Sequence, residues 1–586
     1  MTETVDHLLE IAALTEWIQV ARGLVPADLC LRNARIVNVF TGSVQEGDLA
    51  VHGGRFVGWG RYDAVRRLDL NGAYVAPGFI DGHLHMESTL LGPSAFWRAV
   101  LPRGTTAVVL DPHEIANVLG VAGIRYLLGA AGKLPVDLFF MLPSCVPASP
   151  LETSGAVLRG ADLQTLRSHP RVLGLAEVMN FPGLLASDPQ VLEKVALFQD
   201  GPMDGHAPFV SGEDLNAYTG VGIRTDHEAT TLQEAQEKLS KGMMLMIREG
   251  SQSKDLEALL PAVTDATWPR CMLVCDDRHP TDLLRDGHMD AVVNRAVSLG
   301  LDPVRAMAMA TINPARHFGL KDRGAIAPGY RADFSVSPTL HPWTPVRVFK
   351  NGVEWVRDGA VVEGMDQVPW EHEGLPESPM WLPPLRQEDL RVRAEGARLR
   401  VITVHAGSLI TDQDLVEVRP TDGYVAADPA QDLLKVAVYN RYVPTDPPGP
   451  AVGFVRGFGL QRGAVASTVA HDSHNLVVVG ASDSAMIVAA KAVAATGGGL
   501  AVADDDHVLA SLALPIAGLM SPRPLEEVCR ELDALNRAAR SLGSTLPHPF
   551  MALSFVALPV IPRLKITDRG LVDVEAFQLV PLFVRD

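Results

Sequence analysis

Apolar residues in the middle of the chain gather in short runs, and most of the stretches between these runs carry apolar residues at helical spacing. One such stretch is 232–241, where apolar residues recur three to four positions apart, the period of an amphipathic helix. The apolar runs end near His83, Asp111, Ser144, Glu177, His206, Asp226, Arg248 and Cys275. Eight strand-and-helix units in about 245 residues match the usual size of a (β/α)₈ barrel. The pattern therefore predicts such a barrel over 75–320.

Shorter strand-like runs lie before and after the predicted barrel segment and are separated by glycine turns. They lie at 29–39, 48–52 and 55–59 before it, and at 329–336 and 345–356 after it. Strands of this kind bounded by glycine indicate a small β domain. We expect one discontinuous β-sandwich domain, built from 26–74 and 321–366, into which the barrel is inserted. Helical spacing at 9–22 predicts an N-terminal helix within 1–25.

The last third of the chain begins with a proline-rich segment and then mixes strand-like and helix-like runs. Residues 367–385 are rich in proline, glutamate and tryptophan, which is typical of a linker. Beyond them, strand-like runs occupy 398–404, 433–439 and 476–479, and helix-like runs occupy 484–495 and 524–542. Residues 386–586 are therefore predicted to form a separate C-terminal α/β domain, and the whole chain belongs to the α/β class.

Composition and charge narrow the classes of ligand. With 586 residues, 47% hydrophobic and 20% charged, the chain is typical of a globular protein with several domains. A net charge of −18 repels phosphates and anionic membranes, so we expect a small-molecule substrate and no nucleic-acid or membrane partner. Three further features predict a cytoplasmic protein. The five cysteines are scattered, the acidic start has no signal-peptide pattern, and no apolar run is long enough to span a membrane.

Two histidines separated by one residue close the first predicted strand. In an extended strand, residues i and i+2 point to the same side, so His83 and His85 can reach one metal ion; taken alone, the pair also fits two surface histidines near a turn. Side chains at the carboxyl ends of barrel strands converge on one mouth. Imidazoles and carboxylates are ligands for one or two divalent ions. The predicted ligands are His83, His85, Glu177, His206, His227 and Asp276.

Further charged residues follow three of the predicted strands. Glu114 follows the second strand, Glu228 the sixth, and Arg248 closes the seventh. Each suits a proton donor or a substrate clamp. A helix cap or an ion pair is an equally good interpretation of each of them.

The chain resembles bacterial adenine deaminases, which belong to the amidohydrolase superfamily. The motifs that carry the resemblance include Pro-Gly-Phe-Ile-Asp-Gly-His-Leu-His-Met-Glu-Ser at 77–88 and Asp-Pro-His-Glu-Ile-Ala-Asn at 111–117. Others are 143–147, 177–183, 204–208, 248–251, 276–280, 287–288, 310–315 and 323–329, and in the C-terminal segment 471–475 and 514–520. Because they extend over nearly the whole chain, the resemblance is specific. Two positions depart from the family pattern, with Ala229 in place of cysteine and Cys275 in place of threonine.

The resemblance implies hydrolytic deamination of adenine to hypoxanthine and ammonia, with a metal-bound hydroxide as the nucleophile. It implies two divalent ions, manganese or iron, with zinc as an alternative. Glu177 stands where many relatives carry a carboxylated lysine, which argues against the hydantoinase and dihydroorotase branches. Asp276 is expected to accept the proton of the water. Glu114 and Glu228 are the candidates to protonate the purine, with His113 a further one. The expected substrate-binding residues are His113, Arg248, Glu87 and Ser88.

Several alternatives remain open at this point. The same chemistry suits an amidohydrolase that acts on a cyclic amide or on another aminated heterocycle. A further hypothesis is a relative that binds purines but does not turn them over. His471 and His474 either close the active site, bind a further ion, or serve the C-terminal domain alone. By analogy with related barrel enzymes we expect a homo-oligomer, a dimer or a tetramer.

Overall fold

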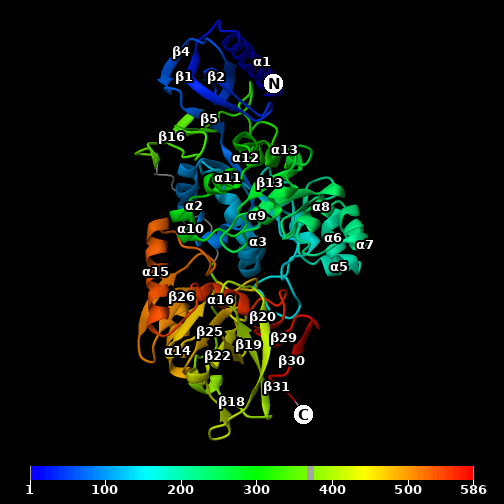
Figure 1. Ribbon diagram of the computed structural model, residues 1–586, viewed down its shortest axis with the longest axis vertical. Coiled ribbons are helices and arrows are strands. Elements are labelled where there is room, and N and C mark those ends of the chain that lie inside the picture. Colours follow the sequence, from blue (N-terminus) through cyan, green and yellow to red (C-terminus); the bar gives the residue numbers. More distant parts are fainter. Residues whose placement is uncertain (1, 366–374, 376, 585–586) are drawn as a thin grey trace.

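The computed structural model describes residues 2–365, 375 and 377–584, so most of the first half of the predicted linker 367–385 lies outside the described residues. Figure 1 shows a small β domain, a central α/β body and a C-terminal α/β domain in a row along the longest axis of the molecule. Among the described residues, none of the helices has the length and apolar character needed to cross a membrane.

The small β domain is one sheet built from both ends of the barrel segment. Its strands follow the order β17-β16-β15-β14-β5-β1-β2-β3, and β4 pairs with β1. The two halves of the chain meet where β14 runs antiparallel to β5, with Val336 opposite Val75. The strands are β1 (Ala27–Asn38), β2 (Ser43–His52), β3 (Arg55–Trp59), β4 (Ala64–Asp69), β5 (Tyr74–Pro77), β14 (Phe334–Ser337), β15 (Arg347–Lys350), β16 (Val353–Arg357) and β17 (Ala360–Val361). Helix α1 (Thr2–Ala21) packs near β3.

The central body contains the predicted parallel strands, in two hydrogen-bonded groups. Five strands follow the order β10-β9-β8-β7-β6, and three follow the order β11-β12-β13. A parallel bridge between Leu84 and Asp276 joins β6 to the end of β13. At the other junction, the Gly205 amide donates to Thr225 Oγ1 over 3.0 Å. The strands are β6 (Phe79–Leu84), β7 (Thr105–Leu110), β8 (Asp137–Leu142), β9 (Val172–Val178), β10 (Met203–Gly205), β11 (Thr225–Asp226), β12 (Met244–Arg248) and β13 (Cys271–Val274). The eight parallel strands of the predicted (β/α)₈ barrel are thus confirmed.

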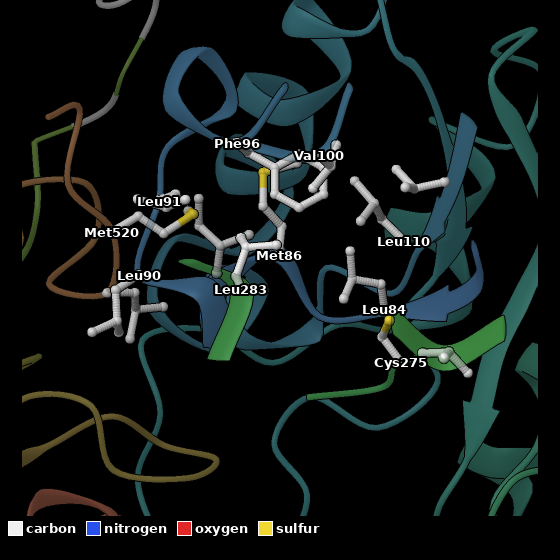
Figure 2. Packing of buried hydrophobic residues seen from close by; sticks show 14 of the residues in the cluster. Leu84, Met86, Leu90, Leu91, Phe96, Val100, Leu110, Cys275, Leu283 and Met520 are labelled. Atoms are coloured by element: carbon white, nitrogen blue, oxygen red, sulfur yellow. The ribbon is translucent and has the colours of Figure 1, made fainter. Parts of the chain in front are cut away.

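Alternate residues along the barrel strands face two different hydrophobic clusters. Inward-facing Ile80, Val109 and Met246 belong to a cluster that fills the barrel, as expected for layered barrel interiors. Leu84 and Leu110 belong to the cluster outside it (Figure 2). The barrel helices are α2 (Pro93–Val100), α3 (His113–Ala130), α4 (Gly160–Gln164), α5 (Phe181–Leu185), α6 (Pro189–Leu197), α7 (Gly212–Gly220), α8 (Leu232–Ser240), α9 (Leu256–Leu259), α10 (Pro280–Arg285), α11 (Met289–Ser298), α12 (Pro303–Met309) and α13 (Ile312–His317).

The C-terminal domain is a second mixed sheet with helices. Its main sheet follows the order β20-β19-β23-β22-β25-β24-β26-β27, and β31 pairs with β19. The strands are β19 (Arg398–Val404), β20 (Thr411–Glu417), β22 (Leu434–Tyr439), β23 (Ala451–Arg456), β24 (Ala464–Ser467), β25 (Leu476–Gly480), β26 (Gly499–Ala503), β27 (Val508–Ala513) and β31 (Phe583–Val584). The helices are α14 (Asp483–Ala495), α15 (Leu525–Ser541) and α16 (Pro549–Val556), and a small sheet holds β28 (Leu564–Thr567), β29 (Gly570–Asp573) and β30 (Gln578–Val580).

The C-terminal domain is tied to the barrel through backbone and apolar contacts. The Gly92 amide donates to the Ser521 carbonyl, and the Ser521 amide to the Leu90 carbonyl, each over 2.8 Å. Met520 is buried in the same cluster as Leu91 and Phe96 of the barrel (Figure 2). The two bodies therefore share one apolar interface, which lies on the side of the barrel where its strands end.

Candidate metal centre

The carboxyl ends of β6 and β13 bring His83, His85 and Asp276 together. Asp276 Oδ1 lies 3.4 Å from His83 Nε2 and 3.1 Å from His85 Nε2. Asp276 has a φ of 60°, a left-handed conformation that is uncommon outside glycine, although aspartate adopts it more readily than most residues. Its amide donates to the His83 carbonyl over 3.0 Å. The backbone bridge between the first and eighth strands thus holds this carboxylate against both histidines.

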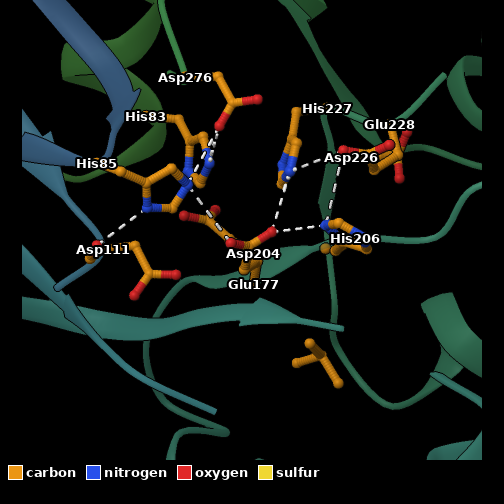
Figure 3. A network of polar contacts seen from close by, with 12 residues as sticks. His83, His85, Asp111, Glu177, Asp204, His206, Asp226, His227, Glu228 and Asp276 are labelled. Atoms are coloured by element: carbon orange, nitrogen blue, oxygen red, sulfur yellow. Dashed lines mark hydrogen bonds and ion pairs between the residues drawn. The ribbon is translucent and has the colours of Figure 1, made fainter. Parts of the chain in front are cut away.

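Glu177, at the end of β9, lies between this group and two further histidines. Its Oε1 is 3.5 Å from His85 Nε2. Its Oε2 is 2.7 Å from His206 Nδ1 and 3.0 Å from His227 Nε2. Figure 3 shows these contacts, with Glu177 facing both sets of imidazoles. The six residues predicted as ligands therefore lie in one cluster, with Glu177 between the two groups of imidazoles.

The tautomer of His85 indicates a cation in the cluster. Its Nδ1 lies 3.1 Å from the Asp111 carbonyl, and a carbonyl only accepts, so Nδ1 carries the proton. The lone pair of Nε2 then faces carboxylate oxygens of Asp276 and Glu177. Because the lone pair and these oxygens repel one another, a positive charge must lie between them, either a metal ion or a second proton on the ring. Donation of the other ring nitrogen to a carbonyl is the usual support of a metal-bound histidine.

Burial and charge in the cluster also fit divalent ions. All of its members except His206 are buried, and His83 Nε2 has no hydrogen-bond partner among the described residues. Burial alone would raise the pKa of Glu177, but His227 and His206 outweigh it and hold that pKa well below its usual range. His83 and His85 likewise lower the pKa of Asp276 against the effect of burial. Two carboxylates and four imidazoles are a donor set for manganese, iron or zinc.

Arg248, at the end of β12, contacts three carboxylates at the edge of the cluster. Its Nη1 donates to Asp276 Oδ2 over 3.2 Å and pairs with Glu228, while its Nε donates to Asp255 over 3.1 Å. Glu228 Oε1 in turn lies 3.5 Å from His227 Nε2. The fork of the guanidinium fixes such carboxylates in both distance and direction.

A buried ion pair holds the loops that carry His206 and His227. Asp226 accepts from the amides of Ala207 and Ala229, each over 2.9 Å. Its countercharge is Lys238, whose Nζ donates to Asp226 Oδ2 over 2.7 Å and whose side chain is 1% exposed. Lys238 also donates to the Ala207 carbonyl over 2.8 Å. The pair therefore ties both histidine loops to α8.

Replacing Lys238 with methionine is expected to lower the free energy of unfolding by about 3–5 kcal/mol, because Asp226 would remain buried without its countercharge. Lys241→Met, which removes a partly exposed lysine of the same helix region that pairs with Glu237, should cost less than about 1 kcal/mol. Denaturant unfolding of both variants measures the difference. Equal stability of the two would show that Lys238 does not support these loops.

The other predicted site residues occupy different positions. His113 Nδ1 lies 3.5 Å from Glu177 Oε1 and 3.0 Å from Asp111 Oδ2, beside the cluster. Ser88 donates to Asp277. Glu87 is buried and accepts from the Ile115 amide over 3.0 Å, and burial raises its pKa to about 7. Glu87 is therefore directed toward α3 and does not line the cavity between the barrel mouth and the C-terminal domain.

A cavity of about 600 Å³ lies between the barrel mouth and the C-terminal domain, within the range of roughly 300–1,000 Å³ typical of small-molecule sites. Ser88, Ser251, Asp277 and His279 line it from the barrel, and His471 and Phe555 are among the residues that line it from the C-terminal domain. Ser88 follows His85 by three residues and Asp277 directly follows Asp276. The cavity is therefore bordered by the same segments that carry the cluster.

Sequence reasoning did not assign a role to Asp111, to Asp277 or to the contact between Glu114 and the C-terminal domain. Asp111 follows the end of β7, so the convergence of strand ends already contained the signal for it. Asp277 sits next to a predicted ligand. The partners of Glu114, His471 and His474, are 357 and 360 residues away in sequence, and no local pattern indicates such a contact.

Two protein-family models match this chain, one over the barrel segment and one over the C-terminal domain. The model of the amidohydrolase family matches residues 74–357, and that of the adenine deaminase C-terminal domain matches 408–578. An adenine deaminase from Syntrophobacter fumaroxidans is 56% identical over 566 residues, covering 97% of this chain and 98% of the relative. Adenine deaminase 2 from Carboxydothermus hydrogenoformans is 48% identical, covering 97% and 99%. A crystal structure of an adenine deaminase aligns at 15% identity and a TM-score of 0.43, covering 56% of this chain and all of that one.

Proposed function

The chain belongs to the adenine deaminase family of amidohydrolases, and on this premise we propose that it hydrolyses adenine to hypoxanthine and ammonia at the cluster around Glu177. The observation that carries the assignment is the position of Glu177, whose two oxygens face separate groups of imidazoles. A carboxylate in that position can be shared by two divalent ions.

Divalent metal dependence follows from the amidohydrolase family, and we propose two ions per chain, manganese or iron, with zinc as an alternative. One ion would be held by His83, His85, Glu177 and Asp276, and the other by Glu177, His206 and His227. When bound, such ions lower the pKa of water and supply hydroxide near neutral pH. The dimer or tetramer and the cytoplasmic location stay predictions.

Asp276 is the proposed acceptor of the water proton. Its Oδ1 faces His83 and His85, and its Oδ2 is held by Arg248, so the carboxylate is fixed at the centre of the reacting groups. The carboxylate takes up one proton of the water. It then passes the proton to the exocyclic amine, which leaves as ammonia.

Glu228 and Arg248 are the proposed contacts for the amine side of the substrate. Glu228 lies beside His227 and its charge is fixed by Arg248. Its carboxylate can therefore accept hydrogen bonds from the exocyclic amino group. Glu114, the other carboxylate that the sequence suggested for protonation of the ring, has both oxygens engaged by imidazoles. That arrangement makes it an acceptor rather than a proton donor.

Ammonia release from a panel of bases tests the proposed function. Protein loaded with manganese or iron is expected to release ammonia from adenine, and to act at least about 100-fold more slowly on adenosine, guanine and cytosine, because recognition of polar edges discriminates strongly between analogues. Hydrolysis of a cyclic amide such as hydantoin, without turnover of adenine, would favour the other amidohydrolase activity. Purine binding without turnover would indicate a catalytically silent relative.

A further inference from the structure

The C-terminal domain places two histidines on a carboxylate of the barrel. His471 and His474 follow β24, and both contact Glu114 at the start of α3. His471 Nδ1 lies 2.6 Å from Glu114 Oε1, and His474 Nε2 contacts Glu114 Oε2. All three side chains are largely or fully buried. Each oxygen of this carboxylate therefore has an imidazole partner from the other domain.

The tautomer of His474 is fixed by its backbone contact. The Ala470 amide donates to His474 Nδ1 over 3.2 Å, so that nitrogen carries a lone pair and the ring proton is on Nε2, which donates to Glu114. Burial lowers the pKa of His474 to about 4, so the ring is neutral. Neither nitrogen then has a free lone pair, although the three residues are close enough together to suggest a metal site. The trio is thus a hydrogen-bonded unit rather than an ion site.

His471 differs from His474 because one of its ring nitrogens is left for a ligand. Nδ1 is occupied by Glu114, and the ring stacks on Phe555 with 5.1 Å between centroids. Its Nε2 has no hydrogen-bond partner among the described residues, while the side chain is 14% exposed and lines the cavity. Burial opposes the charged form, but Glu114 outweighs it and raises the pKa of His471 to about 9. A carboxylate behind an imidazole orients the ring and stabilises its cation.

The backbone around His471 is anchored to the rest of the domain. Arg441, which is fully buried, donates from Nε to the His474 carbonyl over 2.7 Å and from Nη2 to the Ala517 carbonyl over 2.8 Å. Tyr442 donates to the Ser473 carbonyl. The segment 471–475 is therefore held at the cavity wall by buried contacts, which is the preorganisation that a proton donor needs.

We propose that His471 is a catalytic residue of the deamination, whose Nε2–H contacts the purine in the interdomain cavity and protonates a ring nitrogen, while Glu114 is the positioning residue that holds Nδ1–H. The inference rests on the proposed function. It assigns the proton donation expected of Glu114, Glu228 or His113 to a histidine of the C-terminal domain instead, and it gives that domain a direct part in the reaction.

His471, Asp276 and solvent account for every proton that moves in the reaction. Water oxygen bonds to C6 while the C6–N1 π bond breaks; its electron pair takes the proton of His471 at N1, and Asp276 takes one proton of the water. The C6–N6 bond then breaks, and the amine takes the proton from Asp276 and leaves as ammonia. The remaining proton on the C6 oxygen returns through solvent to His471, leaving hypoxanthine. The sum is adenine plus water to hypoxanthine plus ammonia.

His471→Asn separates the proposed role from a structural one. The asparagine amide can replace Nδ1–H toward Glu114 but offers nothing in place of Nε2–H. We expect kcat for adenine to fall by about 100-fold or more, as for loss of a general acid, with KM, metal content and melting temperature close to those of the parent protein. His405→Asn is the matched control, because His405 belongs to the same domain as His471 and likewise pairs with a carboxylate, that of Asp412 at 2.8 Å, but lies exposed at the surface.

A second variant distinguishes loss of the proton donor from loss of the fold. His471→Ala should be similarly slow and should regain part of its kcat when imidazole is added, which a purely structural role would not produce. A kcat for His471→Asn within about threefold of the parent, or loss of bound metal in that variant, would overturn the proposal. Absence of adenine turnover in the metal-loaded parent protein would instead refute the proposed function.

Discussion

Asp276→Asn is expected to lower kcat for adenine by about 1,000-fold while the protein keeps its fold and its bound metal. General bases contribute typically 10²–10⁴ to a rate, and Asp276 is the carboxylate that faces His83 and His85 and is fixed by Arg248. Asparagine keeps an oxygen toward the histidines but cannot accept the proton of the water. Steady-state kinetics on protein of measured metal content gives the comparison.

Asp265→Asn is a suitable control for Asp276→Asn. Asp265 is an exposed aspartate of the same body that pairs with Arg305 at the surface. Its replacement should leave kcat unchanged. If Asp276→Asn were as active as this control, Asp276 would not be the proton acceptor, and the acceptor would have to be sought at another carboxylate of the cluster.

Glu177→Gln is expected to abolish tight binding of both metal ions and with it the activity. Glu177 faces His85 through one oxygen and His206 and His227 through the other. Glutamine keeps the shape but loses the charge and offers a single acceptor oxygen, so neither group of imidazoles retains its full donor set. After dialysis against chelator-free buffer, we expect less than one metal ion per chain, and a fall in kcat/KM of more than about 1,000-fold.

Glu213→Gln provides the control for the loss of metal. Glu213 lies exposed in the first turn of α7, so its replacement should leave the metal content and the activity as they are. Metal analysis of the two variants, prepared side by side, decides the question. Two ions per chain retained in Glu177→Gln would contradict the bridging role of Glu177.

The sequence allowed the barrel to be predicted because its strands are short, buried and regularly spaced. The predicted strand ends lie within two residues of the observed ones, even for β10 and β11, which contain only three and two residues. Because parallel strands in a closed barrel direct their carboxyl ends to one mouth, the proximity of His83, Glu177 and Asp276 followed from strand ends alone.

Contacts between domains could not be predicted in the same way. Periodicity places residues on faces of local elements, whereas the pairing of Glu114 with His471 depends on how the C-terminal domain docks against the barrel mouth. Within the barrel, the contact of Glu87 was also not predicted: the 3₁₀ turn Met86–Thr89 directs its carboxyl to the Ile115 amide. A role of Glu87 in substrate binding stays a prediction. The order of strands in the C-terminal sheet likewise requires non-local pairing.

Titration of metal-free protein with manganese, while ammonia release from adenine is followed, tests the central claim most directly. The cluster around Glu177 predicts activity that rises with added metal and reaches its maximum at two equivalents per chain. Maximal activity at one equivalent would contradict a two-ion centre bridged by Glu177. Turnover of adenine that persists in fully metal-free protein would contradict the assignment of this cluster as the catalytic site.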